Sequence, residues 1–351
     1  MAERLYQEAI QLAEQHVGPE SAAMALPASL MAEIRYEEGR MEDAEKLLID
    51  RIPVIEAAAM LDCVLRAHVT MARVAAWRVN YERAYAHLES AEKLGQARGW
   101  GRLAAAALSE RLRFNLAEGK QTEARACLNR LEALASEYSA PTRCAWSDIR
   151  LYAALAGVHI AMEERRLPDA IAILRQLHAE AIATENQYTG LRVATQLALA
   201  LRAANVPAEA HAMFRDVLRL GAAARISQAI LDQGRETGAL LSHFTRAAPR
   251  SERPDEVAGY ANSLLVRWRK HYEQDTAGSG RLPDTRLLTE REHAVLRLIG
   301  EGRSNKDIAR NLGITPETAK SHVKNIFVKL GVDKRLLAVA RGRGLGLIET
   351  R

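Results

Sequence analysis

The strongest constraint on the fold of this chain is a pattern that recurs five times in its first 220 residues. Each copy joins the end of one helix, marked by glycine or another turn residue, to a second helix that carries alanine in its first turn. The equivalent alanines are Ala44, Ala84, Ala124, Ala170 and Ala210. Their separations are 40, 40, 46 and 40 residues. A period near 40 that contains two helices is typical of an α-solenoid, in which helix pairs stack side by side.

The alanines have a physical reason to occupy these positions. Two antiparallel helices joined by a short turn come closest near that turn, and a small side chain permits the approach. Gly39 and Gly119 suit the left-handed residue that ends a helix, whereas Pro168 and Pro207 suit the first turn of the next helix. Apolar residues then recur at three- and four-residue steps, as helices facing a core require. We therefore predict helix pairs across about 2–227, within a TPR-like helical-repeat domain of residues 1–245.

The composition favours an all-α fold. Only 5% of the 351 residues are aromatic, whereas strands are rich in aromatic and β-branched side chains. The longest uncharged runs are about a dozen residues, too short for the ~20 residues of a membrane helix. The charged N-terminus does not resemble a signal peptide. We therefore expect a soluble, cytoplasmic protein that has no membrane partner.

The sequence contains no recognisable catalytic or metal-binding motif. It contains no GxSxG, HExxH or DxDxDG motif, and its three cysteines, Cys63, Cys127 and Cys144, lie too far apart for a disulfide framework or a metal pattern. We expect buried, reduced thiols, no metal, no cofactor and no enzymatic activity.

The positive charge is concentrated near the C-terminus. Residues 286–351 contain 14 Lys and Arg against 7 Asp and Glu, whereas the rest of the chain contains 35 against 37. A basic domain on a near-neutral body indicates binding to a polyanion. Residues 273–285 are polar, contain glycine and proline, and are predicted to form a flexible linker before this domain. A connecting segment, 246–272, is predicted to hold one helix over about 254–272.

Boundary signals predict four helices in the basic domain. The first three each begin at a capping hydroxyl and end at a glycine. The caps are Thr289, Ser304 and Thr315, and the glycines are Gly300, Gly313 and Gly331. The fourth helix is predicted from Lys334 to about Gly342. A short helix, a tight turn that contains glycine and a longer helix make a helix-turn-helix.

The third helix, at about 316–330, has an apolar face and a polar face. The apolar face, with Ala319, His322, Val323, Ile326 and Leu330, is expected to pack on the first two helices. The predicted base contacts on the polar face are Lys320, Ser321 and Lys324, because such a helix can enter the major groove of double-stranded DNA. The predicted phosphate contacts are Ser304, Asn305, Lys306, Thr318, Asn325, Lys329, Lys334 and Arg335. A lone lysine on a helix is usually only solvated, but here the caps, the turn and the regional charge all favour DNA binding.

This domain closely resembles the LuxR-type helix-turn-helix domain of bacterial transcription regulators. The shared motifs include Gly302-x-Ser304-Asn305-Lys306-x-Ile308-Ala309, Thr318-x-Lys320-x-His322 and Lys329-Leu330. The resemblance covers about 60 residues. It implies a third helix that contacts DNA and a fourth, C-terminal helix through which two chains form a homodimer. Ala319 departs from the pattern, since the family usually has valine there.

The whole chain resembles the C-terminal part of MalT-like regulators. In that family a nucleotide-binding module precedes a helical-repeat sensor, and a LuxR-type domain ends the chain. The stretch ILDQGRETGALL, at 230–241, also resembles the segment that follows the repeats in that family. The sequence has no GxxxxGK[ST] loop, so we expect either a fragment of a longer protein or a short relative, without ATP-driven activation.

These observations predict a transcription regulator. Its helical repeats are expected to sense an inducer, either a small molecule or a protein, although a passive scaffold remains an alternative reading of the repeats alone. The competing interpretation of the chain is a TPR-like interaction adaptor whose tail associates with DNA non-specifically.

Overall fold

The computed structural model of this chain describes residues 2–18, 21–138, 146–247, 256–278, 290–330, 332, 335 and 337–339. Within these ranges the secondary structure is helical and no strand occurs, so the predicted all-α class is confirmed. The chain divides into two compact units, Met1–Glu273 and Gln274–Arg351.

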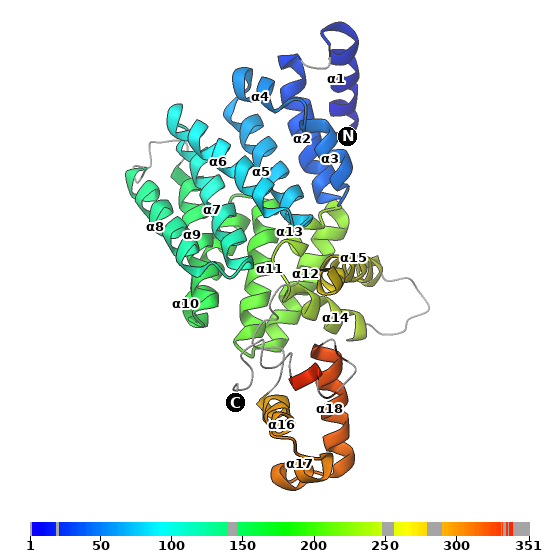
Figure 1. The fold of residues 1–351 in the computed structure, drawn as a ribbon. Helices are drawn as coiled ribbons and strands as arrows, with labels where there is room; N and C mark the ends of the chain where they lie inside the picture. The colour runs from blue at the N-terminus through cyan, green and yellow to red at the C-terminus, as the bar shows by residue number, and fades with distance from the viewer. Residues whose placement is uncertain are drawn as a thin grey trace. The chain divides into compact units, whose positions relative to one another are not determined.

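The first unit is an array of helix pairs, coloured from blue to green along the chain in Figure 1. A helix α1 (Ala2–His16) and a short turn of 3-10 helix (Ala22–Met24) precede the array. The helices are α2 (Ala25–Glu37), α3 (Met41–Leu48), α4 (Ile52–Ala58), α5 (Leu61–Trp77), α6 (Tyr81–Ala97), α7 (Gly101–Ala117), α8 (Gln121–Glu137), α9 (Trp146–Glu163), α10 (Leu167–Ala183), α11 (Gln187–Ala203) and α12 (Pro207–Ala224). The five repeated segments join α2 to α3, α5 to α6, α7 to α8, α9 to α10 and α11 to α12.

The turns within the pairs follow the predicted chemistry. Gly39 and Gly119 have φ angles of +78° and +76°, in the left-handed region that glycine reaches without strain. The corresponding turns at Val79, Arg165 and Asn205 adopt φ angles of 60–62° without glycine.

The repeated alanines are the points of closest packing. All five have no exposed surface, as their small size at the helix crossings predicts. They belong to apolar clusters in which the second helix of a pair packs against the first helix of its own and the next pair.

Enlarging one of these alanines should therefore destabilise the repeats. We expect Ala84→Leu to lower the free energy of unfolding by about 1–3 kcal/mol, because added methyl groups in a filled core force their neighbours to move. Ala86→Leu, on the exposed face of the same helix, is the matched control. Urea unfolding followed by circular dichroism measures both. Equal stability of the two variants would contradict the assigned packing.

Three further helices complete the first unit: α13 (Gln228–Leu231), α14 (Thr237–Ala247) and α15 (Glu256–Gly278). Ile230, Leu240 and Leu264, one from each, lie in a single buried cluster with Phe214 of α12. Thus α15 packs into the core of the repeats instead of merely connecting the two domains.

The helix α15 is also longer than the predicted range of about 254–272. It runs six residues into 273–285, the segment predicted as a linker, and ends at Gly278. Glutamate and glutamine, at 273 and 274, extend a helix at little cost, whereas glycine favours its end. Residues 279–289 lie outside the described part of the chain.

The second unit contains α16 (Glu290–Gly300), α17 (Asn305–Leu312) and α18 (Pro316–Leu330). Its core joins these helices through Leu296, Ile308, Ala319 and Ile326. Of the fourth predicted helix, the structure describes only Arg335 and residues 337–339, which are helical, and Ala338 is buried in the same core. Across both units, no described helix is long and apolar enough to cross a lipid bilayer.

Candidate nucleic-acid interface

The turn between α17 and α18 is built by local capping, as the sequence predicts. The Asp307 backbone N–H donates to the Ser304 hydroxyl at 3.3 Å, and the Ser304 N–H donates to the Asp307 carboxylate at 3.2 Å, which forms a complete capping box. Gly313 ends α17 with a φ of +62°. The Thr318 N–H then donates to the Thr315 hydroxyl at 3.2 Å at the start of α18. The predicted cap at Thr289 lies outside the described residues.

This geometry fixes which side of α18 is available to a partner. Ala319 and Ile326 have no exposed surface, and Val323 has 8%, so this face packs on α16 and α17. On the opposite side Glu317, Lys320 and Ser321 are exposed. The Lys320 side chain is 71% exposed, and its ammonium lies 3.5 Å from the Glu317 carboxylate. Such an exposed pair is weak, so the ammonium can exchange Glu317 for another anion at little cost.

The predicted base contacts are therefore only partly described. Lys320 and Ser321 point away from the core, and Lys324 lies one turn further along α18, but its side chain is outside the described residues. His322 is half-buried.

The predicted phosphate contacts fall into three groups. Ser304, Lys306 and Thr318 are exposed at the ends of α17 and α18. The guanidinium of Arg335 donates to the Asn305 side-chain oxygen at 3.2 Å and also to the Arg303 carbonyl. Arg335 and Asn305, both predicted phosphate contacts, therefore bind each other within the unit. The side chains of Asn325 and Lys329, and all of Lys334, lie outside the described residues.

Two of the exposed hydroxyls also have partners of their own. The Ser304 hydroxyl donates to the Asp307 carboxylate at 2.6 Å, and the Thr318 and Thr315 hydroxyls lie 2.8 Å apart. The hydrogen bonds from Ser304 hold the pKa of Asp307 below its usual value. The carboxylate therefore stays ionised at neutral pH and keeps the start of α17 capped.

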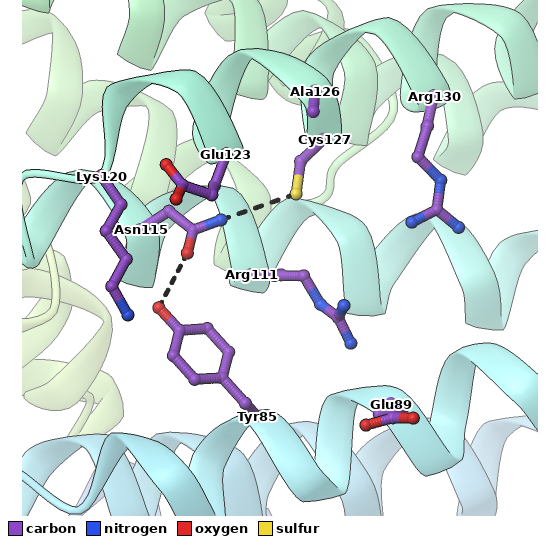
Figure 2. Close-up of a pocket in the computed structure, with 9 residues that line it drawn as sticks. All are labelled: Tyr85, Glu89, Arg111, Asn115, Lys120, Glu123, Ala126, Cys127 and Arg130. Atoms are coloured by element: carbon purple, nitrogen blue, oxygen red, sulfur yellow. Dashed lines mark hydrogen bonds between the residues drawn. The ribbon is translucent and has the colours of Figure 1, made fainter.

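The repeats contain a polar groove that the sequence does not reveal. It lies between α6, α7 and α8 and has a volume of about 390 Å³ (Figure 2). Its lining residues are Tyr85, Glu89, Arg111, Asn115, Lys120, Glu123, Ala126, Cys127 and Arg130. The Tyr85 hydroxyl donates to the Asn115 side-chain oxygen at 2.8 Å, and the Asn115 amide donates to the Cys127 sulfur at 3.7 Å. Lys120 and Arg130 form ion pairs with Glu118 and Glu92, so their charges are largely balanced.

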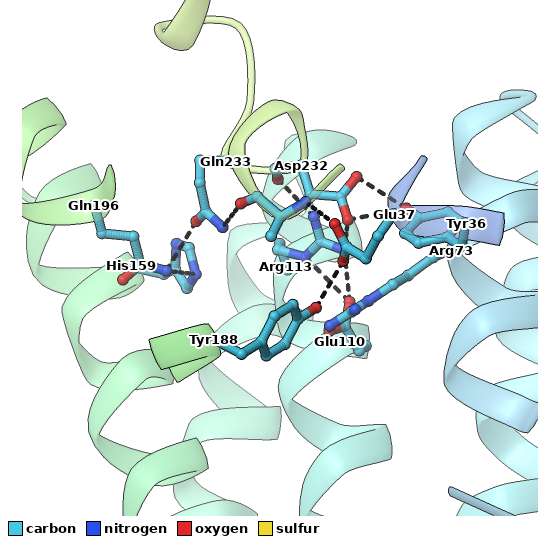
Figure 3. Close-up of polar contacts among 11 residues, drawn as sticks. Tyr36, Glu37, Arg73, Glu110, Arg113, His159, Tyr188, Gln196, Asp232 and Gln233 are labelled. Atoms are coloured by element: carbon cyan, nitrogen blue, oxygen red, sulfur yellow. Dashed lines mark hydrogen bonds and ion pairs between the residues drawn. The ribbon is translucent and has the colours of Figure 1, made fainter. Parts of the chain in front are cut away.

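A second polar cluster is buried inside the repeats (Figure 3). The Glu110 carboxylate accepts from Arg73 Nε at 3.1 Å and from Arg113 Nη2 at 2.6 Å, and its side chain is only 6% exposed. Burial alone would raise the pKa of Glu110, but the two guanidinium groups outweigh burial and hold it well below the usual value. The carboxylate is therefore a fixed negative charge between two fixed positive charges.

A signal for this cluster does exist in the sequence. Tyr36, Arg73 and Glu110 are separated by 37 residues each, and so are His159, Gln196 and Gln233. This constant spacing of 37 residues is close to the repeat period near 40, and polar residues at such a spacing indicate one shared face. Among the described residues, no group of three or more His, Cys, Asp or Glu side chains is placed to hold a metal ion.

Two family models match this chain, one within each of its two units. Residues 1–247 match the family model described as the MalT-like TPR region, and residues 286–341 match the model of bacterial regulatory proteins of the luxR family. No solved structure matches significantly.

Individual relatives match over short stretches. The transcriptional regulatory protein LiaR of Bacillus subtilis is 40% identical over 98 residues, which is 28% of this chain and 43% of LiaR. The transcriptional regulatory protein MctR of Rhizobium johnstonii is 58% identical over 45 residues, 13% of this chain and 21% of MctR. The HTH-type transcriptional regulator AlkS of Ectopseudomonas oleovorans is 44% identical over 62 residues, 18% of this chain and 7% of AlkS. The chain therefore spans less than half the length of each of these relatives.

Proposed function

The chain belongs to the family of proteins with a MalT-like TPR region, and from that premise we propose that it is a bacterial, DNA-binding transcription regulator. The C-terminal unit binds promoter DNA through α18, in the cytoplasm, as a homodimer formed through the C-terminal helix. The helical repeats sense an inducer or a partner protein. This proposal includes no enzymatic step.

The observation that carries this proposal is the orientation of α18. Its apolar face is buried against α16 and α17, whereas Lys320 and Ser321 are exposed, which supports contact of this side with a major groove. Helix-turn-helix proteins read bases from this position, with the first residues of the second helix. The match to luxR-family regulatory proteins covers the whole of α16, α17 and α18 and supports the same role.

Removing the two lysines of α18 should abolish specific DNA recognition. In vitro selection with the wild-type chain first provides the operator. We expect the double variant Lys320→Ala, Lys324→Ala to bind it roughly 100-fold more weakly, because each good base contact is worth about 1–3 kcal/mol. Fluorescence anisotropy at fixed salt measures the affinity, since salt alone changes protein–DNA binding strongly.

The control is Lys93→Ala, which removes an equally exposed lysine from α6 in the repeat unit. It should bind the operator like the wild type. Unchanged operator affinity in the α18 double variant would refute the assignment of α18. If the wild type selects no sequence at all, the adaptor with non-specific DNA association becomes the better description.

A further inference from the structure

The segment between α12 and α14 folds back onto the beginning of the repeats. The Ser227 N–H donates to the Glu37 carbonyl at 2.9 Å, and the Ala229 N–H donates to the Glu37 carboxylate at 2.9 Å. The Tyr36 hydroxyl lies 2.9 Å from both carboxylate oxygens of Asp232. We call residues 226–233, which include α13, the clasp. Helix pairs of a solenoid normally contact only their neighbours, so these bonds between residues about 190 positions apart are exceptional.

The clasp is tied to the middle of the array as well. The Arg113 guanidinium donates to the Asp232 carbonyl at 2.6 Å and lies 4.0 Å from the Asp232 carboxylate. Arg113 in turn pairs with Glu110, which also holds Arg73 (Figure 3). The side chain of Asp232 is only 9% exposed. The joint between the two ends of the repeats is therefore a buried polar network.

The clasp also holds α15. Arg267 of α15 donates to the Ser227 hydroxyl and to the Gln228 side-chain oxygen, both at 2.6 Å, and to the Glu38 carbonyl at 3.4 Å. Further along α15, the His271 ring stacks on Trp77 of α5 with ring centres 3.8 Å apart. The position of α15 therefore depends on both the clasp and the early helices α2 and α5.

The polar contacts of this joint can open at modest cost, whereas the apolar contacts of Ile230 and Leu264 resist its opening. Buried ion pairs lose much of their attraction to desolvation, so they stabilise a contact less than apolar packing of similar size. Four buried polar atoms have no hydrogen-bond partner among the described residues, and they lie in the clasp or directly beside it. They belong to Gln196, Gln228, Thr237 and Trp268. When the joint opens, these atoms can bond to water, which offsets part of the free energy needed to break the other hydrogen bonds.

The clasp is bounded by two turns in the left-handed region. Arg225, just before it, and Gly234, just after it, have φ angles of +56° and +102°. Helix α15 ends at Gly278, within the second unit, which begins at Gln274. The helix that the clasp holds is therefore continuous in sequence with the second unit.

We propose that the clasp is a conformational switch: when closed it joins the first and last helix pairs and holds α15, and when open it releases α15 and changes the DNA affinity of the C-terminal unit. This inference rests on the proposed DNA-binding function. An inducer acts on this switch by binding one of its two states more tightly than the other.

The test uses Tyr36→Phe in the full chain, which removes the hydroxyl bond to Asp232 and keeps the ring in the core. Hydrogen exchange followed by mass spectrometry should show faster exchange in residues 226–233 and in α15 together, by about tenfold or more, since a hydrogen bond to a charged group is removed. Operator affinity should change about fivefold or more, the lower end of typical coupling between sites. Asp232→Asn provides the same test from the other side if Tyr36→Phe does not fold.

The matched control is Tyr85→Phe, which removes a hydroxyl that lies 2.7 Å from the Glu118 carboxylate and 2.8 Å from the Asn115 side-chain oxygen, away from the clasp. It should leave both the exchange of α15 and the operator affinity unchanged. Faster exchange in the clasp with unchanged exchange in α15, or with wild-type operator affinity, would overturn the proposal. Failure of the wild type to bind DNA would instead refute the proposed function. Exchange, which is measured without DNA, would then decide whether the clasp holds α15.

Discussion

Replacing Glu110 by glutamine is expected to lower the free energy of unfolding of the repeats by about 3–5 kcal/mol, because it breaks a buried ion pair from one side. The glutamine has nearly the same volume, so packing is preserved. The change removes the one negative charge that Arg73 and Arg113 share through bonds of 2.5–3.1 Å. The two buried guanidinium groups then lose the carboxylate that lies between them, and the Asp232 carboxylate, 4.0 Å from Arg113, compensates only in part.

Urea unfolding at neutral pH measures this effect, with Glu89→Gln as the matched control. Glu89 forms a 2.6 Å pair with Lys93 on the exposed side of α6, where such a pair contributes little to stability. If Glu110→Gln unfolds at the same urea concentration as Glu89→Gln, the buried cluster does not stabilise the repeats.

The helix pairs could be predicted because their determinants are local. An alanine at a helix crossing, a glycine such as Gly39 in a left-handed turn, and a proline such as Pro207 at a helix start each act within a few residues. The caps at Ser304 and Thr315 place α17 and α18 for the same reason. The family comparison with MalT-like repeats and luxR-family proteins agrees with both assignments.

The buried cluster could not be predicted in this way because its partners are distant in sequence. Glu37 can accept hydrogen bonds from Tyr188 and Ala229 only when the array of helix pairs has brought its two ends together. The curvature of the array is not set by any pattern within a few residues. The repeat spacing of Tyr36, Arg73 and Glu110 places them on one face but does not say that Asp232 fills the space beside them. From sequence alone, charged side chains on the helices of the repeats are interpreted as solvent-exposed.

The extent of α15 illustrates a different limit. Its polar residues at 273–277 resemble a linker, yet they continue a helix whose first half is anchored by Ala261 and Leu264 in the core. An anchored helix extends readily through residues of good helix propensity because its nucleation has already occurred. Composition therefore predicted a polar segment here but not the end of the helix.

Acidification from pH 7.5 to pH 5 should destabilise the repeats through two histidines. Burial, together with nearby positive charge, lowers the pKa of His159 to about 4, and burial and the His68 ring lower the pKa of His87 to about 4. The ordinary value is 6.5. Between these values the unfolded chain binds more protons than the folded chain, so stability is complete above pH 6.5 and falls as the pH drops towards 4.

The expected loss is about 2 kcal/mol at pH 5 for His159, from the linkage between proton binding and folding, and it is smaller for His87, which solvent screens in part. Glu37 acts in the opposite sense, because burial raises its pKa and protonation then favours the folded form. Because Glu37 is present in the wild type and in the histidine variants alike, its contribution cancels when their stabilities are compared at the same pH. In urea unfolding, His159→Gln should reduce the difference in stability between pH 7.5 and pH 5 by about 2 kcal/mol, and His87→Gln should reduce it by less.

His16→Gln, at an exposed position of α1, is the control for this measurement and should leave the pH dependence unchanged. His159 is connected to the clasp through Gln196. The His159 ring nitrogen lies 3.3 Å from the Gln196 amide nitrogen, and this amide donates to the Gln233 side-chain oxygen at 2.9 Å. Protonation of His159 would place a positive charge beside Arg113 and Arg192, in the cluster that closes the repeats. Retention of the full pH dependence in both the His159 and the His87 variant would show that acid acts on the repeats through other groups.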